Sequence, residues 1–451
     1  MNINTEKNDT FTRMTTEPIP KLICSMAVPT IISMLVTSFY NMADTYFVGS
    51  LRKSAVGGVG VVFPVMAVIQ AFGFFFGHGS GNYISRELGR QNYDSAEKMA
   101  ATGFFSALIF GCIIMISGLA FSNDLVYLLG ATNTIAPYAK QYLNIILLGA
   151  PYMTASFVMN NQLRFQGRAV YSMIGIATGA VTNLFLTPLF IFVFDMGVAG
   201  AALGTVISQL LSFCLLLYGT MHSDSIKIRL KKFTPSFYYY KEIFAGGTPS
   251  LFRQGLASVA TTCLNIVANP YGDAAIAAMS IVSRVMMFAN SAVIGFGQGF
   301  QPVCGFNYGA GKYSRVKKAY SFCVKTGFIF LLCVSLLCIV FSRNIIGEFA
   351  RGDLDVIDIG ARAFRYQCLT MPLNALIVLS NMMTQTIRMP VRASIIAISR
   401  QGLIFIPAVF IGSYLFGLTG ILCAQPISDI CTFFMSFLIT ISVLKTMSKD
   451  L

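Results

Sequence analysis

The chain contains no tryptophan, only two histidines and few charged residues of either sign. Charged side chains make up 11% of its 451 residues, whereas a soluble domain usually carries about 25%. Hydrophobic residues make up 55%, which is more than a soluble core can shield from water. The shortage of charge therefore excludes an ordinary soluble protein and predicts that the surplus apolar surface faces lipid.

Several motifs that would indicate catalysis or a cofactor are also missing. The sequence has no Walker A loop, no CxxC pair, no plausible zinc cluster and no nucleophile elbow. We therefore expect a protein that is not an enzyme, that holds no cofactor and that ATP does not drive directly. The formal charge of +14 would suggest a nucleic-acid partner in a soluble protein, but here the cations lie in short segments between hydrophobic runs. This pattern indicates membrane topology and no nucleic-acid partner.

Long apolar runs recur along the whole chain. A membrane-spanning helix needs about 20 mostly apolar residues. The sequence predicts twelve such spans, at 21–48, 55–84, 97–121, 136–160, 170–194, 197–220, 242–268, 274–304, 315–341, 360–385, 394–414 and 418–444.

Lysine and arginine are concentrated in alternate connections, most densely in residues 227–241. Cation-rich connections lie on the cytoplasmic side of a membrane. We therefore expect both termini in the cytoplasm, which requires an even number of spans.

The two halves of the chain match at an offset of 220 residues. The matched pairs include Pro29 with Pro249, Gly77 with Gly297, Gly89 with Gly309 and Gly200 with Gly420. A six-span unit enters and leaves the membrane on the same side, so the two copies have parallel topology. This arrangement is common in transporters.

The predicted fold is therefore an all-α integral membrane protein with twelve transmembrane helices in two six-helix bundles. The bundles are related by a pseudo-two-fold axis along the membrane normal. We expect a flexible cytoplasmic tail at 1–19, an N-lobe at 20–221, a basic cytoplasmic linker at 222–241 and a C-lobe at 242–451.

Short motifs near the ends of the spans resemble those of the multidrug and toxic compound extrusion (MATE) family, closest to its DinF-like and MepA-like branch. The resemblance covers nearly all of residues 20–445 and implies a two-lobe antiporter. Such antiporters export cationic or amphipathic compounds, driven by inward flow of protons or sodium. The motifs are Ala27–Pro29, Asp44–Gly49, Ile84–Gly89, Gly200–Thr205, Gly295–Pro302 and Asn307–Ala310.

Charges at membrane depth are costly, so each one is a functional candidate. Asp44, late in the first span, is the best candidate for the coupling-ion site. Its repeat partner is Leu264, so the fold itself does not require an acid there. A carboxylate shielded from water can take up a proton, or it can give one oxygen to a sodium ion. The alternative is a carboxylate that caps neighbouring groups such as Ser38 and Tyr40.

The resemblance also implicates Asn183 in the fifth span and Thr205 in the sixth, as groups that could hydrogen-bond Asp44. Related proteins often carry an Asp-Pro pair in the fifth span, where this chain has Thr187-Pro188. Asp44 is thus the only acid deep in the N-lobe, which weakens the case for a two-carboxylate proton relay. Ordinary hydrogen bonding between helices is the alternative role for Asn183 and Thr205.

The C-lobe is expected to bury more cations than acids. NorM-like relatives carry acids in the seventh and eighth spans, where this chain has Arg253-Gln254 and Ser283-Arg284. Asp429 in the twelfth span is expected to pair with Arg400 or Arg253, as a structural ion pair or in coupling and substrate contact. Net positive charge here disfavours a cationic drug beside it. Other substrate-cavity candidates, with packing between helices as the alternative, are Tyr40, Gln298 and Gln301.

We therefore expect a secondary active antiporter in the bacterial plasma (inner) membrane that works as a monomer. It would exchange protons or sodium for small, amphipathic, cationic xenobiotics by alternating access. A flippase or exporter of lipid-linked or anionic substrates is the main alternative, and a membrane scaffold or receptor without transport is a weaker one.

Overall fold

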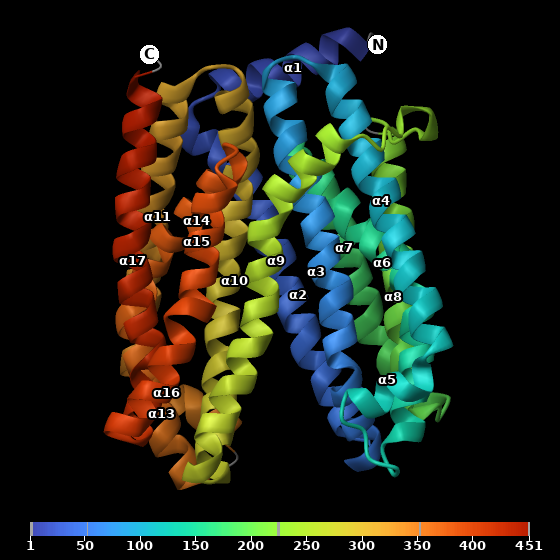
Figure 1. The fold of residues 1–451 in the computed structure, drawn as a ribbon, viewed down its shortest axis with the longest axis vertical. Coiled ribbons are helices and arrows are strands. Elements are labelled where there is room, and N and C mark those ends of the chain that lie inside the picture. The colour runs from blue at the N-terminus through green and yellow to red at the C-terminus, as the bar shows by residue number, and fades with distance from the viewer. Residues whose placement is uncertain (1–2, 52, 223–225, 351–352, 450–451) are drawn as a thin grey trace.

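The computed structural model describes residues 3–51, 53–222, 226–350 and 353–449. All regular elements within these ranges are helices, arranged as two bundles that stand side by side (Figure 1). The N-lobe contains α2 (Ile19–Gly49), α3 (Lys53–Gly89), α4 (Tyr93–Ala120), α5 (Ser122–Leu128), α6 (Ala136–Phe165), α7 (Ala169–Pro188), η1 (Leu189–Val193) and α8 (Gly197–His222). The C-lobe contains α9 (Phe237–Ala268), η3 (Asn269–Tyr271), α10 (Asp273–Gly309), α11 (Tyr313–Val340), α12 (Ser342–Phe349), α13 (Leu354–Thr370), η4 (Met371–Leu373), α14 (Asn374–Thr386), α15 (Pro390–Ile398), η5 (Ser399–Leu403), α16 (Phe405–Phe416) and α17 (Leu418–Lys449).

Each of the twelve predicted spans falls on one membrane-crossing unit. Ten helical units in the described ranges are long and apolar enough to cross a membrane. The other two are α9, which carries Arg253, and α13–η4–α14, which the 3-10 turn at Met371–Leu373 divides into two shorter helices. The prediction of twelve transmembrane helices is confirmed.

The two lobes share contacts and backbone conformations at positions related by the sequence repeat. Asn160 and Asn381 each donate from Nδ2 to a backbone carbonyl twelve residues further on, at Ser172 and Ala393 respectively. Gly197 and Gly417 lie at the start of the last long helix of each half, and both have positive φ, at 52° and 59°. Only glycine adopts this backbone conformation without strain. The predicted pairing of two similar bundles is thus present in the backbone.

The lobes meet most closely where α3 crosses α10. A Cβ atom added at Gly89 would lie 2.2 Å from the carbonyl oxygen of Phe306, and one at Gly309 would lie 2.0 Å from that of Arg86. Arg86 and Phe306 are themselves related by the 220-residue offset, so the two contacts are equivalent. The missing side chains allow two backbones to approach. The crossing therefore lies on the pseudo-two-fold axis.

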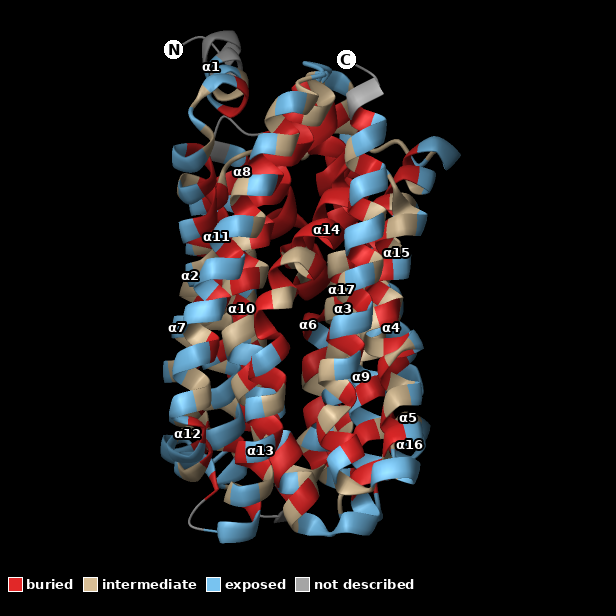
Figure 2. Cartoon of the chain, turned by 90° about the vertical axis from the view of Figure 1, so that its left-hand side faces the viewer, coloured by how far each residue is buried: buried red, intermediate tan, exposed pale blue. Residues whose placement is uncertain are grey.

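Away from this crossing the lobes diverge. Both termini lie at one end of the molecule, which we call the terminal end, and α2 and α3 separate from α9 and α10 toward the opposite end (Figure 1). Ser38 and Ser291, 2.6 Å apart, form an inter-lobe hydrogen bond nearer to that opposite end. Buried residues gather inside the bundles and exposed ones lie along the outer helix faces (Figure 2). Large apolar side chains such as Phe185 and Tyr414 are exposed there, as a lipid-facing surface requires.

The N-terminal segment differs from the flexible tail expected from its polar composition. Residues 1–2 lie outside the described ranges, and Ile3–Thr16 form helix α1. Met14 is buried, and the C-lobe holds the end of this segment through backbone carbonyls. Asn307 donates to the carbonyl of Met14 at 3.0 Å, and Arg315 donates to that of Glu17 at 2.7 Å. The apolar Met14 side chain and the free carbonyls at the helix end explain this docking.

The basic linker packs against the N-lobe. Residues 223–225 lie outside the described ranges, and η2 (Leu230–Lys232) follows them. Lys232 Nζ lies 2.5 Å from Asp94, and this hydrogen bond raises the pKa of the Lys232 ammonium. The backbone N–H of Ile226 donates to Gln166 at 2.7 Å.

Candidate functional site

Asp44 lies near the end of α2, in the part of the N-lobe where the lobes diverge. Its Oδ1 atom is buried and has no hydrogen-bond partner among the described residues. The carboxylate is close enough to Tyr40 on the same helix and to Tyr142 on α6 to act on both electrostatically. Among the described residues no cation pairs with it. This buried oxygen is therefore available to a proton or a metal cation.

Asn183, Thr187 and Thr205 form one hydrogen-bonded chain between α7 and α8. The Thr187 hydroxyl donates to Asn183 Oδ1 at 3.0 Å, and the Asn183 amide donates to Thr205 Oγ1 at 3.3 Å. Thr205 in turn donates to the carbonyl of Ala201. The structure thus brings the three predicted residues together and bonds them to one another rather than to Asp44. All three are buried.

In the C-lobe, Asp429 pairs with Arg400, one of its two expected partners. Arg400 Nε lies 2.9 Å from Asp429 Oδ1. Gln425 donates to the same oxygen at 2.9 Å, and Thr370 donates to Oδ2 at 3.4 Å. With three donors and almost no exposure, this carboxylate is fully compensated.

Arg164 is a buried cation that the sequence analysis did not select. The predicted span at 136–160 ends before Arg164, whereas α6 continues to Phe165 and Arg164 is 1% exposed. Its guanidinium donates to Gln298 Oε1 at 2.6 Å and to Asn161 Oδ1 at 2.7 Å, and it contacts His78 Nε2 at 3.3 Å. The apolar neighbours Leu163 and Phe165 were the available signal for burial.

The remaining C-lobe candidates divide into buried and exposed side chains. Gln301 is buried, and neither end of its amide has a partner in the described part of the chain. Arg253 and Gln254 are half-buried on α9, and Arg253 donates to Asn381 Oδ1 at 3.4 Å. Arg284 is exposed, which corrects the expectation of a buried charge.

A second buried ion cluster, also missed from the sequence, lies near the terminal end. Arg86 Nη2 on α3 lies 3.0 Å from Glu242 Oε2 on α9, and Arg388 pairs with the other oxygen of Glu242. Arg86 also donates to the carbonyl of Thr386 at 2.7 Å. Only the approach of the two lobes buries Arg86.

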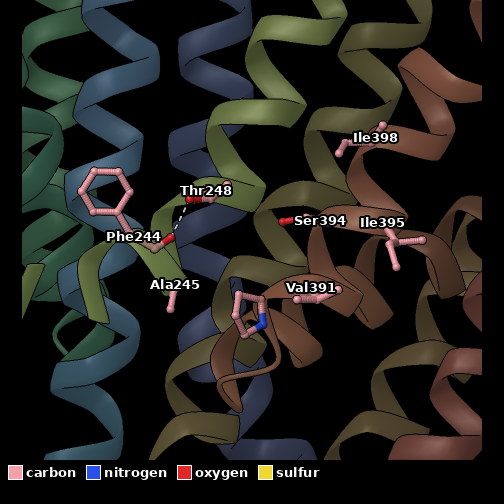
Figure 3. A pocket seen from close by; sticks show the side chains of 8 residues that line it. Phe244, Ala245, Thr248, Val391, Ser394, Ile395 and Ile398 are labelled. Atoms are coloured by element: carbon pink, nitrogen blue, oxygen red, sulfur yellow. Dashed lines mark hydrogen bonds between the residues drawn. The ribbon is translucent and has the colours of Figure 1, made fainter. Parts of the chain in front are cut away.

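A shallow pocket lies elsewhere, between α9 and α15 (Figure 3). Its walls include Phe244, Thr248, Val391 and Ile395, and the Thr248 hydroxyl is bonded to the carbonyl of Phe244. It contains none of the candidate residues and exposes apolar groups, so it belongs to the lipid-facing surface.

No cluster of three or more histidine, cysteine, aspartate or glutamate side chains occurs in the described ranges. A sodium ion at Asp44 would therefore take its other oxygen ligands from amides, hydroxyls, backbone carbonyls or water.

The chain is similar to bacterial multidrug export proteins over most of its length. It is 29% identical over 414 residues to the multidrug export protein MepA of Staphylococcus aureus (strain MSSA476), with 91% of each chain covered. It is 28% identical over 432 residues to MepA of Staphylococcus haemolyticus, with 95% of each chain covered.

Solved structures show the same fold. A multidrug resistance MATE family transporter of the MOP superfamily, described in an outward-facing conformation, has a TM-score of 0.92 and 25% identity, with 97% of this chain and 98% of that chain covered. A MOP superfamily transporter from Pyrococcus furiosus, described as having a binding pocket of reverse polarity, has a TM-score of 0.91 and 25% identity, with the same coverage.

The MatE family model matches residues 29–189 and 249–411, one stretch in each lobe. The matched stretches contain Asp44, Asn183 and Arg253 as well as the lobe crossing. With this match and the shared fold, the chain belongs to the MatE family of multi-pass membrane transporters.

Proposed function

We propose that this protein is a secondary antiporter that exports small amphipathic, mainly cationic compounds in exchange for protons or sodium by alternating access. The observation that carries the proposal is the Oδ1 atom of Asp44, which is buried and unpartnered in the described N-lobe. The names of the MepA relatives support multidrug export as the activity.

A buried carboxylate without a partner is unstable as an anion. Binding a proton or a sodium ion removes that cost, so occupancy of Asp44 changes the energy of any state that shields it from water. The Asn183, Thr187 and Thr205 chain supplies neutral oxygen atoms in the same lobe. Coupling then requires only that ion and substrate have different affinities for the two states.

Membrane orientation follows from the distribution of cations. Lysines and arginines of the linker and of the loops near the termini lie at the terminal end, which the positive-inside rule assigns to the cytoplasm. The lobes then diverge toward the outside of the bacterial plasma membrane, with both termini inside. Similarity to a transporter described as outward-facing supports this assignment.

The test is efflux of ethidium from cells that lack their own pumps, with Asp44→Asn compared at equal expression. Asp195→Asn is the matched control, because Asp195 is an exposed N-lobe acid at a turn with φ of 50°, where asparagine is well tolerated. A protonophore and sodium replacement, applied separately, identify the coupling ion.

We expect the native protein and Asp195→Asn to export the dye and Asp44→Asn to fail. Export by Asp44→Asn at the native rate under both gradients would refute the role of Asp44. Absence of export by the native protein under any gradient would refute the cationic multidrug activity.

One observation favours a second candidate, the export of anionic or lipid-linked compounds. Arg164 is buried, its hydrogen-bond partners are Asn161, Gln298 and His78, and it forms no salt bridge among the described residues, which favours an anionic partner there. The relative described as having a pocket of reverse polarity is consistent with such a variant of the fold. Failure of ethidium efflux together with transport of an organic anion would favour this candidate.

A further inference from the structure

We propose that the groove between α9 and α15 binds one anionic phospholipid of the cytoplasmic leaflet. An acyl chain lies in the groove, which is the pocket walled by Phe244, Thr248, Val391 and Ile395 (Figure 3). The phosphate lies at the cations around the terminal end of the groove, which we call the rim. Only the choice of leaflet depends on the orientation proposed above, and the binding does not depend on the role of Asp44.

The groove itself is almost entirely apolar. Its volume, about 450 Å³, lies within the range of ligand pockets in proteins, about 300–1,000 Å³. The Thr248 hydroxyl donates to the carbonyl of Phe244 at 2.7 Å, so it offers no free donor to the groove. A groove of this kind on a lipid-facing surface accommodates a hydrocarbon chain. The full lining is Phe244, Ala245 and Thr248 of α9 and Pro390, Val391, Ser394, Ile395 and Ile398 of α15.

Two cations lie at the rim of this groove. Lys241 precedes Phe244 by three residues and Thr248 by seven, so it shares their face of α9, and it is exposed. Arg388, in the turn that leads into α15, is 54% exposed and pairs with Glu242 of α9. The Arg388 side chain therefore spans the same two helices that form the groove.

The charge of the rim is net positive. Glu242 is buried, and it also pairs with Arg86 at 3.0 Å, so it neutralises at most one of the cations near it. Lys241 and Arg392 form no salt bridge in the described part of the chain. A phosphate is attracted to such a rim, whereas a cationic amphiphile is repelled from it. The two helix ends, 237–248 and 386–398, contain one acid, Glu242, and three cations, Lys241, Arg388 and Arg392.

Aromatic residues place the rim at the boundary between lipid and water. Phe237 and Tyr238 begin α9 and are 84% and 52% exposed. Aromatic side chains are enriched at this boundary, and lysine or arginine side chains beside them meet the phosphate groups. Phe244 lies about 4.5 Å deeper along the helix than Lys241, at the start of the acyl-chain region. The order of residues along α9 thus matches the order of groups along a phospholipid.

The experiment uses a tryptophan placed in the groove. The chain contains no tryptophan, so a single introduced one reports only its own surroundings. Phe244→Trp places the probe on the α9 wall, and Val391→Trp places an independent probe on the α15 wall; both positions are exposed. The second probe carries the test if the first variant does not fold.

The sequence repeat supplies a matched control. Cys24 is the repeat partner of Phe244 at the offset of 220 residues and is also exposed, so Cys24→Trp probes the N-lobe at an equivalent position. Lys21 is the repeat partner of Lys241, but it is paired with Glu17 at 3.1 Å. The cation beside the control probe is therefore already compensated.

Each full-length variant is reconstituted into vesicles of phosphatidylcholine that contain an increasing fraction of phosphatidylglycerol. The acyl chains of one lipid at a time carry bromine, which quenches tryptophan fluorescence on contact. The ratio of quenching by the two lipids then gives their relative binding constant at the probe.

We expect phosphatidylglycerol to be preferred at least about fivefold by Phe244→Trp and Val391→Trp, since one cation at a membrane surface contributes about this factor. In the Phe244→Trp background, Lys241→Gln should lower the preference by about fivefold, and Lys21→Gln should leave it unchanged. At Cys24→Trp the two lipids should bind about equally.

Equal quenching by the two lipids at both groove probes, or the same preference at Cys24→Trp, would overturn the site. Equal effects of Lys241→Gln and Lys21→Gln would also overturn it, because they would indicate a general attraction to the charged surface. Relief of quenching by the lipophilic cation tetraphenylphosphonium, but not by the anion tetraphenylborate, would assign the groove to cationic substrates instead and overturn the phospholipid site.

Discussion

Arg86 Nη2 lies 3.0 Å from Glu242 Oε2, and this ion pair joins helix α3 of one lobe to helix α9 of the other. It is one of three polar layers that follow a single face of α3, at His78, Asn82 and Arg86, spaced four residues apart. In the middle layer the Asn82 oxygen accepts from Thr386 at 2.8 Å. In the first layer, Arg164 beside His78 bonds to Gln298. Together the layers fasten the lobes at the terminal end.

Glu242→Gln should weaken this fastening. The change leaves the buried Arg86 without a negative partner, and breaking a buried pair costs about 3–5 kcal/mol. We expect a clear fall in the denaturation midpoint and in export rate. The control is Asp358→Asn, because the Arg343–Asp358 pair is exposed on both sides and is worth about 1 kcal/mol or less. Equal effects of the two substitutions would contradict a special role for Glu242.

Gly309→Ala should separate the lobes at their crossing. The new Cβ would lie 2.0 Å from the carbonyl oxygen of Arg86, which is backbone and cannot rotate away. We expect loss of transport and a lower midpoint. Gly60→Ala in α3 is the control, since nothing lies within 4 Å of its Cβ position. That substitution should be neutral or stabilise the helix by up to about 1 kcal/mol. A native transport rate in Gly309→Ala would show that this close crossing is dispensable.

Asp429→Asn should destabilise the protein because it leaves the Arg400 guanidinium uncompensated, at a cost of about 3–5 kcal/mol. The double variant Arg400→Met with Asp429→Leu should recover most of that stability and retain transport, since an ion pair can be replaced by apolar groups. Both properties can be measured in one preparation by thermal denaturation and by dye export in proteoliposomes. Recovered stability with transport still absent would instead assign Asp429 to ion or substrate binding.

Thr205→Val should reduce export more than it reduces stability. The substitution keeps the side-chain volume but removes the hydroxyl that accepts from Asn183, at a stability cost of about 1 kcal/mol. If the chain of Asn183, Thr187 and Thr205 helps to hold the coupling ion, export should fall at least about tenfold, equivalent to 1.4 kcal/mol. Thr262→Val is the control, because that hydroxyl bonds only to the carbonyl of Ser258 on its own helix. Similar export by both variants would show that the hydrogen bonds among Asn183, Thr187 and Thr205 serve only to pack the helices.

The local sequence was sufficient to predict the membrane spans and the internal repeat. Apolar runs of about 20 residues can satisfy their backbone polar groups in lipid only as helices, so twelve runs gave twelve helical crossings. The α13–η4–α14 crossing was predicted as one segment, although Pro372 interrupts its helix. Composition also indicated that Asp44 is unusual, because no other acid lies at membrane depth in that lobe.

The membrane fold, its two halves and the rarity of charges inside the spans follow from the sequence alone, because they depend on hydropathy and on short-range periodicity. Which of these charges are compensated depends on the packing of distant segments against one another. Arg86 and Glu242 are 156 positions apart and meet because glycines let the lobes approach. Arg164 lies at the end of α6 and is a buried cation without a salt bridge among the described residues, because burial at a helix end depends on what packs against it. Arg284, inside α10, is exposed because no neighbouring helix covers its side chain. Such long-range pairing has no local signature in one sequence.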